Sequence, residues 1–272
     1  MLELEHGFRV VDANARLGPG AGGRRSGRAG DPERLEREMH QAGIVRSVVY
    51  PTEQDGSYLK ANNGVARRSV DRPLVPLARI TGARDPGDGP GARIRNLRAS
   101  RGEGDTSPED IEQYAYDDRF AGFVLHPPAD GLPDTEVLEE LSDVGLPVVV
   151  HAGQAFPPES VAETILPYDF PTVLASFGGY PLQRELMERA IDLLDSYDAC
   201  YLDTSYVRFR DPLERAVMEH PDRVFFGSGA PDAHPNVAVM EILTLDVPED
   251  AMRKVFSKNA ARVLSELAPR SF

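Results

Sequence analysis

The sequence predicts an α/β protein whose strands and helices alternate to form a (β/α)8 barrel, with extra helices at the C-terminal end. Eight short apolar runs recur along the 272 residues, and most segments between them have apolar residues at helical spacing. The length is also typical of such a barrel. An open doubly wound sheet is the structural alternative, but no G-x-G-x-x-G motif follows the first apolar run. We therefore expect a single barrel domain over residues 1–272.

Each element follows from one of these runs. The eight expected strands are residues 8–14, 45–50, 74–80, 120–126, 146–151, 171–176, 200–205 and 223–228. The clearest helical patterns lie between them, at residues 32–43, 134–145, 181–196 and 211–220. Gly43 and Gly145 stand where helix C-caps are expected. The stretch 237–267 is expected to form two or three helices outside the barrel.

Two segments interrupt this rhythm and are predicted to be long loops. They are residues 17–31, rich in Gly and Arg, and residues 81–107, with little apolar content. The first follows a strand, so it is expected at the C-terminal mouth, where barrels build their sites. There it would act either as a lid that places Arg24, Arg25 or Arg28 over an anion, or as a solvated loop.

Charge and cysteine content exclude several classes of partner. The chain has 44 Asp+Glu against 30 Lys+Arg, a formal charge of −14, which would repel nucleic acid and anionic membrane surfaces. The sequence has neither a signal-peptide pattern nor an apolar run of membrane-spanning length. Cys200 is the only cysteine and is expected to be buried, which excludes an internal disulfide. We expect a cytoplasmic protein that binds a small molecule, with neither nucleic acid nor membrane as partner.

Seven motifs follow one another along nearly the whole chain. They are VVDANARLG (10–18), GFVLHP (122–127), LPVVVHAG (146–153), TVLASFGG (172–179), YLDTS (201–205), RVFFGSGAP (223–231) and KVFSKNAARVL (254–264). In this order they resemble the metal-dependent amidohydrolase superfamily, in its amidohydrolase-related branch that includes aminocarboxymuconate semialdehyde decarboxylase. The resemblance implies a barrel enzyme, and a homodimer because many relatives are dimers.

The resemblance also implies a metal at the mouth, held by an H-x-H on strand 1, histidines on strands 5 and 6, an Asp on strand 8 and, in some members, a carboxylated Lys on strand 4. His151 matches the strand 5 ligand. The other positions depart from the pattern, being occupied by Asn14, Arg16, Val124, Ser176 and Gly229. A zinc site needs about three or four N, O or S ligands, and Arg16 adds a positive charge instead of a lone pair. We expect no metal and no other cofactor.

Three questions about these residues stay open in the sequence. Arg16 would either bind a substrate carboxylate or form a salt bridge with Asp12 or Asp203. A metal would return only if other residues converged, namely His126, His151, Asp232 and His234. A Ser176, His151 and Asp203 triad is conceivable, although no G-x-S-x-G motif is present. Gly178 and Gly179 are expected to allow a tight turn. Ser205 is expected either to hydrogen-bond a ligand or to have a structural capping role.

These observations lead to one main hypothesis and two alternatives. The main hypothesis is a metal-independent hydrolase or decarboxylase for a small carboxylate or amide, with His151 as acid/base beside Asn14 and Arg16. The substrate site would also include His126, Ser176, Asp203, Ser205 and Asp232. The first alternative is a non-catalytic binding or scaffold protein, and the second is a metalloenzyme with relocated ligands. A polar, ligand-sized hollow favours an enzyme, whereas internal salt bridges that fill the mouth favour a scaffold.

Overall fold

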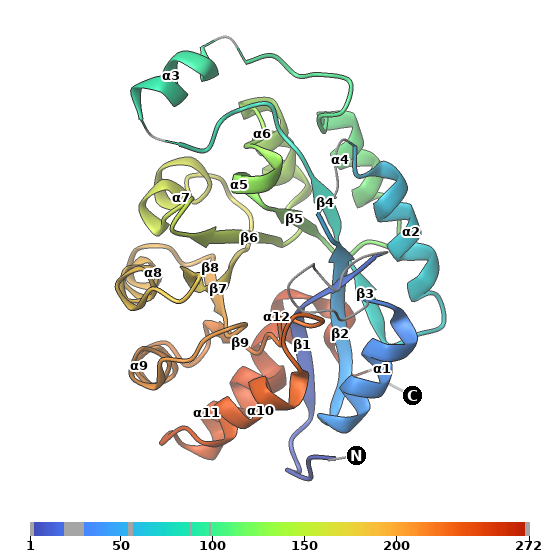
Figure 1. Ribbon diagram of the computed structural model, residues 1–272, viewed down its shortest axis with the longest axis vertical. Helices are drawn as coiled ribbons and strands as arrows, with labels where there is room; N and C mark the ends of the chain where they lie inside the picture. The colour runs from blue at the N-terminus through green and yellow to red at the C-terminus, as the bar shows by residue number, and fades with distance from the viewer. Residues whose placement is uncertain (1–2, 19–29, 54–56, 88, 98, 270–272) are drawn as a thin grey trace.

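Parallel strands form the centre of the molecule (Figure 1). A computed structural model describes residues 3–18, 30–53, 57–87, 89–97 and 99–269. The strands are β1 (Val10–Leu17), β2 (Ile44–Pro51), β3 (Leu74–Pro76), β4 (Ala78–Ile80), β5 (Phe123–Leu125), β6 (Val148–Gly153), β7 (Thr172–Tyr180), β8 (Cys200–Asp203) and β9 (Val224–Phe225). Only Leu77 separates β3 from β4, so these two pieces fill the place of one expected strand, 74–80.

Strand pairing closes the barrel. The strands pair in parallel in the orders β1-β2-β3 and β4-β5-β6-β7-β8-β9. Backbone hydrogen bonds then join the first strand to the segment around the last one. Ala13 N–H donates to the Phe226 carbonyl at 2.8 Å, and Arg16 N–H donates to the Ala230 carbonyl at 2.9 Å. The predicted barrel is therefore confirmed, and the open doubly wound sheet is wrong.

The four clearest helical patterns are confirmed as α1, α6, α8 and α9. The α-helices are α1 (Pro32–Gln41), α2 (Leu59–Ser69), α3 (Pro90–Asn96), α4 (Pro108–Ala115), α5 (Pro127–Asp130), α6 (Thr135–Val144), α7 (Pro158–Thr164), α8 (Arg184–Ser196), α9 (Arg210–Glu219), α10 (Pro235–Leu243), α11 (Glu249–Arg253) and α12 (Asn259–Val263). Gly145 caps α6 with φ 67°, the left-handed conformation that favours glycine. At the C-terminal end, a π-helical turn η1 (Lys254–Lys258) joins α11 to α12, and a 3-10 turn η2 (Ser265–Leu267) follows.

The two interrupting segments differ from the expectation in different ways. Residues 81–107 are not one uninterrupted loop, because α3 forms within them; Asn96 pins it by accepting from the Asp85 N–H at 2.7 Å and donating to its carbonyl at 2.9 Å. In the first segment, Gly18 and Gly30 bridge each other. Arg24, Arg25 and Arg28 lie outside the described residues, so their placement stays a prediction.

Strand alternation separates the two cores of the barrel. One face of each strand packs against the helices, while the opposite face fills the interior with residues such as Val48, Val124, Val149 and Phe225. Because side chains alternate along a strand, the next inward positions toward the C-terminal ends are fixed by this register. Those positions hold polar residues, and they form the mouth. No helix in the described part of the chain is long and apolar enough to cross a membrane.

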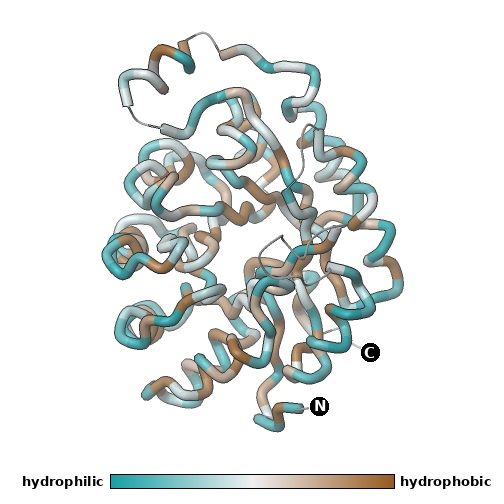
Figure 2. The backbone as a smooth tube through the Cα atoms, viewed as in Figure 1, coloured by the Kyte–Doolittle hydropathy of each residue, from teal (hydrophilic) through white to brown (hydrophobic). Residues whose placement is uncertain are grey.

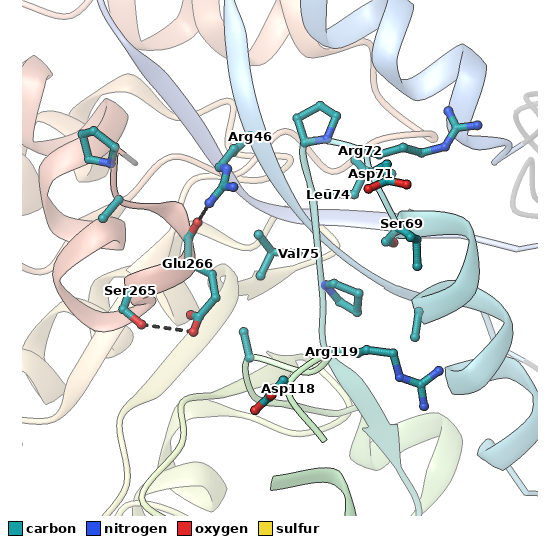
Figure 3. A pocket seen from close by; sticks show the side chains of 17 residues that line it. Arg46, Ser69, Asp71, Arg72, Leu74, Val75, Asp118, Arg119, Ser265 and Glu266 are labelled. Carbon is teal, nitrogen blue, oxygen red and sulfur yellow. Dashed lines mark hydrogen bonds between the residues drawn. The ribbon is translucent and has the colours of Figure 1, made fainter. Parts of the chain in front are cut away.

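A cavity of about 870 Å³ lies at the opposite end of the barrel (Figure 3). It is lined by Arg46 at the start of β2, by β3, and by the C-terminal segment around Glu266. Two of its arginines are neutralised from outside the cavity: Arg72 pairs with Glu33 and Glu36, and Arg119 pairs with Asp117. The polar residues of the mouth do not contribute to this cavity.

Candidate functional site

A hydrogen-bonded chain of three side chains crosses the mouth from β6 to β1. The Tyr50 hydroxyl lies 2.9 Å from Nε2 of His151 and donates to Oδ1 of Asn14 at 2.7 Å. Tyr50 has one hydroxyl hydrogen, and Asn14 uses it, because the Asn14 amide nitrogen is already a donor elsewhere. His151 must then donate from Nε2, which leaves Nδ1 as the lone-pair nitrogen of the neutral ring.

Asn14 connects this chain to a buried carboxylate. Its amide nitrogen donates to Asp203 Oδ2 at 2.7 Å and to Ser205 Oγ at 3.0 Å. Asp203 also accepts from the backbone N–H of Ser176 at 3.1 Å, and all four side chains are buried. Burial raises the pKa of Asp203, while the hydrogen bonds from Ser205, Asn14 and Ser176 lower it. The network holds Asn14 in one orientation, so the proton positions in the His151 chain follow from it.

The Ser176, His151 and Asp203 triad is not formed. Ser176 Oγ lies 3.3 Å from Ser205 Oγ, while His151 Nε2 is taken by Tyr50. Ser176 has φ 55°, an unusual left-handed value for a residue with a side chain, and this turns its N–H toward Asp203. Gly179 next to this turn allows the close approach of α8, because a Cβ there would lie 2.3 Å from Met187 Cγ.

Arg16 forms an ion pair, but not with either of the expected partners. Its Nη2 atom donates to Asp232 and, at 2.6 Å, to the Tyr206 hydroxyl. Asp12 is instead fully buried beneath the mouth, where Ser228 Oγ donates to it at 2.6 Å. Among the described residues, no other nitrogen of the Arg16 guanidinium donates a hydrogen bond. Toward the rest of the described chain, one edge of this permanently charged group is therefore without a hydrogen bond.

The sequence reasoning missed a second arginine, Arg79 on β4. Its side chain is 2% exposed; Nε donates to Asp130 at 2.7 Å, Nη1 donates to the Pro51 carbonyl at 3.1 Å, and Nη2 lies 3.1 Å from His126 Nδ1. His126 Nδ1 also lies 3.1 Å from Glu53, and this contact is the main reason why the pKa of Glu53 falls to about 2. Each of the three guanidinium nitrogens of Arg79 thus contacts a neighbouring group.

His151 lies in a positive electrostatic environment. Its ring centroid is 4.5 Å from that of His126. Burial is the main cause that holds the pKa of His151 well below its usual value, and His126, Arg79 and Arg16 lower it further. Burial also raises the pKa of Tyr50, with Arg16 opposing it. At neutral pH, His151 is therefore a neutral base next to a protonated tyrosine.

The residues of the mouth do not fit the metal that the resemblance implies. No three His, Cys, Asp or Glu side chains come together as a metal-binding group within the described ranges. Of the relocated set, His126 lies beside His151, but Asp232 pairs with Arg16. His234 instead caps α10, where its Nδ1 accepts from the Asn236 N–H at 3.2 Å. The relocated metal site is therefore wrong for this part of the chain.

Cys200 does not contribute to the site. It is fully buried at the start of β8, and burial raises its thiol pKa to about 12. A thiol that stays protonated at neutral pH is a poor nucleophile. The expectation of a buried, apolar cysteine is confirmed.

Solved structures of several barrel proteins are similar to this fold. One is an uncharacterized TIM-barrel protein from Bordetella bronchiseptica, with TM-score 0.66 and 18% identity over 96% of this chain and 99% of that one. Another is a dihydroxybenzoic acid decarboxylase from Polaromonas sp., solved with manganese and 2-nitroresorcinol. Its TM-score is 0.68, and it is 13% identical over 96% of this chain and 98% of that one. A third is a putative 2-pyrone-4,6-dicarboxylic acid hydrolase from Pseudomonas putida, with TM-score 0.68 and 15% identity over 97% of this chain and 100% of that one. At these identities the likeness shows the fold.

The family assignment comes from the sequence. No curated protein matches it. The model of the amidohydrolase family matches residues 83–265, which is more than half of the chain. The match begins after β4, so β1 with Asn14 and Arg16 lies outside it. The chain belongs to the amidohydrolase family.

Proposed function

We propose that the protein is a metal-independent enzyme of this family that acts on a small carboxylate or amide at the barrel mouth. His151 is the general acid/base in this proposal, and Arg16 binds the anionic or carbonyl oxygen of the substrate. The observation that carries the proposal is the hydrogen-bonded chain from His151 through Tyr50 to Asn14, whose histidine feels the charges of Arg16 and Arg79. Ordinary core packing does not need a polar chain of this kind, because buried polar groups cost free energy.

The starting protonation state favours hydrolysis among the reactions of this class. Nδ1 of neutral His151 would accept a proton from water as the water oxygen bonds to the carbonyl carbon, while Arg16 would hold a carboxylate of the substrate in place. The imidazolium then returns the proton to the leaving nitrogen as the C–N bond breaks. Decarboxylation would need the opposite start, with a protonated His151 that delivers a proton to carbon.

A non-catalytic binding or scaffold protein is the second candidate. The observation that favours it is the internal pairing of both arginines, Arg16 with Asp232 and Arg79 with Asp130. Turnover decides between the candidates, tested with the purified protein against a panel of amides, lactones and carboxylic acids. Activity on one of these classes supports the enzyme, whereas an inert protein that still binds small carboxylates supports the binding protein.

We further propose that residues 1–272 act as one domain in the cytoplasm. The buried, free Cys200 supports a reducing compartment, since the chain uses its single thiol for packing and not for a disulfide.

Metal analysis gives the first prediction. We expect the purified protein to hold less than about one tenth of an equivalent of zinc, manganese or iron, because a zinc site needs about three or four ligands and the mouth provides an arginine in place of one of them. Inductively coupled plasma mass spectrometry after dialysis measures this content. About one equivalent of metal that survives dialysis, together with activity lost to a chelator, would overturn the metal-independent proposal.

The second prediction concerns Arg16. We expect Arg16→Met to raise KM about 10- to 100-fold with a smaller change in kcat, because a charged hydrogen bond to a ground-state carboxylate contributes about 1.5–3 kcal/mol. Steady-state kinetics on the substrate found in the panel measures both constants. Arg189→Met is the matched control, because Arg189 forms an exposed ion pair with Glu159 on the outer helices. Equal KM values for Arg16→Met and the wild type would remove Arg16 from substrate binding.

A further inference from the structure

A carboxylate of the chain itself already lies at the mouth. Glu53 follows β2, and its Oε1 atom lies 3.1 Å from Nδ1 of His126, the residue that follows β5. The ring of His126 is in turn 4.5 Å from the ring of His151, measured between centroids. Figure 2 shows hydrophobic residues along the central strands, and this carboxylate lies beyond their carboxyl ends. An anionic group of the protein is thus one ring away from the proposed acid/base.

The carboxylate of Glu53 lies in a positive electrostatic environment. The contact with His126 is the main cause that lowers the pKa of Glu53 to about 2; burial opposes it, and the charges of His126, Arg79 and Arg16 lower the pKa further. Glu53 is therefore negatively charged at neutral pH. Arg16, which is proposed to hold a carboxylate of the substrate, thus also stabilises the carboxylate of Glu53.

His126 cannot satisfy both groups that approach its Nδ1 atom. Nη2 of Arg79 lies 3.1 Å from this nitrogen, the same distance as the Glu53 oxygen. A protonated Nδ1 donates to the carboxylate but has no lone pair for the guanidinium, whereas an unprotonated Nδ1 accepts from the guanidinium and repels the carboxylate. Arg79 is 2% exposed and paired with Asp130, while the Glu53 side chain is 60% exposed. Glu53 is therefore the partner that can leave.

Only the side chain of Glu53 needs to move. The Thr52 N–H donates to the Leu17 carbonyl at 3.2 Å, and Arg79 donates to the Pro51 carbonyl at 3.1 Å, so the two residues before Glu53 are held in place. Exposed side chains change rotamer faster than loops rearrange. The carboxylate can thus turn toward water while the backbone before it stays fixed.

We propose that Glu53 is the resident anion of the mouth and that a ligand carboxylate bound to Arg16 displaces it from His126. Two carboxylates in one positive environment repel each other, and the exposed one exchanges its contact for water at little cost. Glu53 thus makes the mouth selective, because a neutral ligand leaves this carboxylate in place. The inference rests on the proposed carboxylate site but not on turnover, so it applies to a binding protein as well as to an enzyme.

Acetate binding followed by NMR tests the displacement. The chain has six histidines, so the imidazole signals of His126 and His151 can be followed in protein with 13C-labelled histidine, at constant ionic strength. We expect Glu53→Gln to bind acetate about 2- to 5-fold more tightly than the wild type, since no internal carboxylate has to leave an exposed ion pair. The acetate-induced shift of the His126 signal should be smaller in Glu53→Gln, because the contact with Glu53 is already absent.

Glu53→Asp separates displacement from long-range charge. This variant keeps the negative charge but shortens the side chain by one methylene group, which breaks the contact with His126, so acetate should again bind at least about 2-fold more tightly. Glu159→Gln is the matched control and should leave the affinity unchanged, because Glu159 pairs with Arg189 in the first turn of α7. Glu53→Gln that binds acetate no more tightly than the wild type, or Glu53→Asp that equals the wild type, would overturn the proposal. The same holds if neither the wild type nor any Glu53 variant binds acetate.

Arg16→Met distinguishes a failure of the displacement from a failure of the carboxylate site. We expect this variant to lose acetate binding, because it removes the cation that holds the ligand. Unchanged binding in Arg16→Met would contradict the site itself. Unchanged binding in the two Glu53 variants, with binding lost in Arg16→Met, would contradict the displacement alone.

Discussion

Replacing His151 with alanine should lower kcat about 10²- to 10⁴-fold and leave the fold intact. This is the usual contribution of a positioned acid/base group, and His151 has a lone-pair nitrogen, Nδ1, left over from its bond to Tyr50. Steady-state kinetics gives kcat, and circular dichroism with thermal unfolding verifies the fold. His40→Ala is the matched control, because His40 is exposed in the last turn of α1. Full activity of His151→Ala would end the acid/base assignment.

The pH profile tests the same assignment independently. A base must be neutral to accept a proton, and the pKa of His151 is held well below its usual value by burial and the nearby positive charges. Thus kcat/KM should stay constant above this lowered pKa and fall only at more acidic pH. A bound carboxylate adds negative charge next to Arg16, so the acidic limb of kcat should lie at a higher pH than that of kcat/KM. If the acidic limbs of kcat and kcat/KM coincide, the substrate anion does not bind close to His151.

Much of the barrel could be predicted because it depends on local patterns. The apolar runs placed eight strands, and α1, α6, α8 and α9 each show apolar residues on one face. Position 151 could also be placed, since it follows the inward residue Val149 by two on β6. The same alternation could have found two residues that were missed. Tyr50 follows the inward Val48 by two, and Arg79 follows Leu77 by two.

Other features depend on contacts that no local pattern specifies. Arg16 lies on β1, but its partner Asp232 lies in the turn after β9, more than 200 residues later. Only closure of the barrel brings them together, so the sequence left the partner open between Asp12 and Asp203. Ser176 is another case, because its left-handed backbone turns its N–H toward Asp203. A serine in an apolar run gives no sign of that conformation.

The buried pair of Arg79 and Asp130 predicts the largest effect on stability. Both side chains are almost inaccessible, with 2% and 4% exposed. Arg79→Met keeps much of the aliphatic volume but leaves a buried carboxylate without its cation, which typically costs about 3–5 kcal/mol. Urea unfolding followed by tyrosine fluorescence measures the change in the free energy of unfolding. Arg189→Met, which breaks the exposed pair with Glu159, should cost less than about 1 kcal/mol.

A second variant separates the lost cation from lost packing. If the cost of Arg79→Met comes from the unpaired charge, then Arg79→Met combined with Asp130→Asn should recover part of the stability, because the neutral amide keeps the acceptor for the Tyr58 hydroxyl, now at 2.9 Å. A single variant within about 1 kcal/mol of the wild type at neutral pH would show that Asp130 does not need its cation, and that Arg79 serves His126 alone.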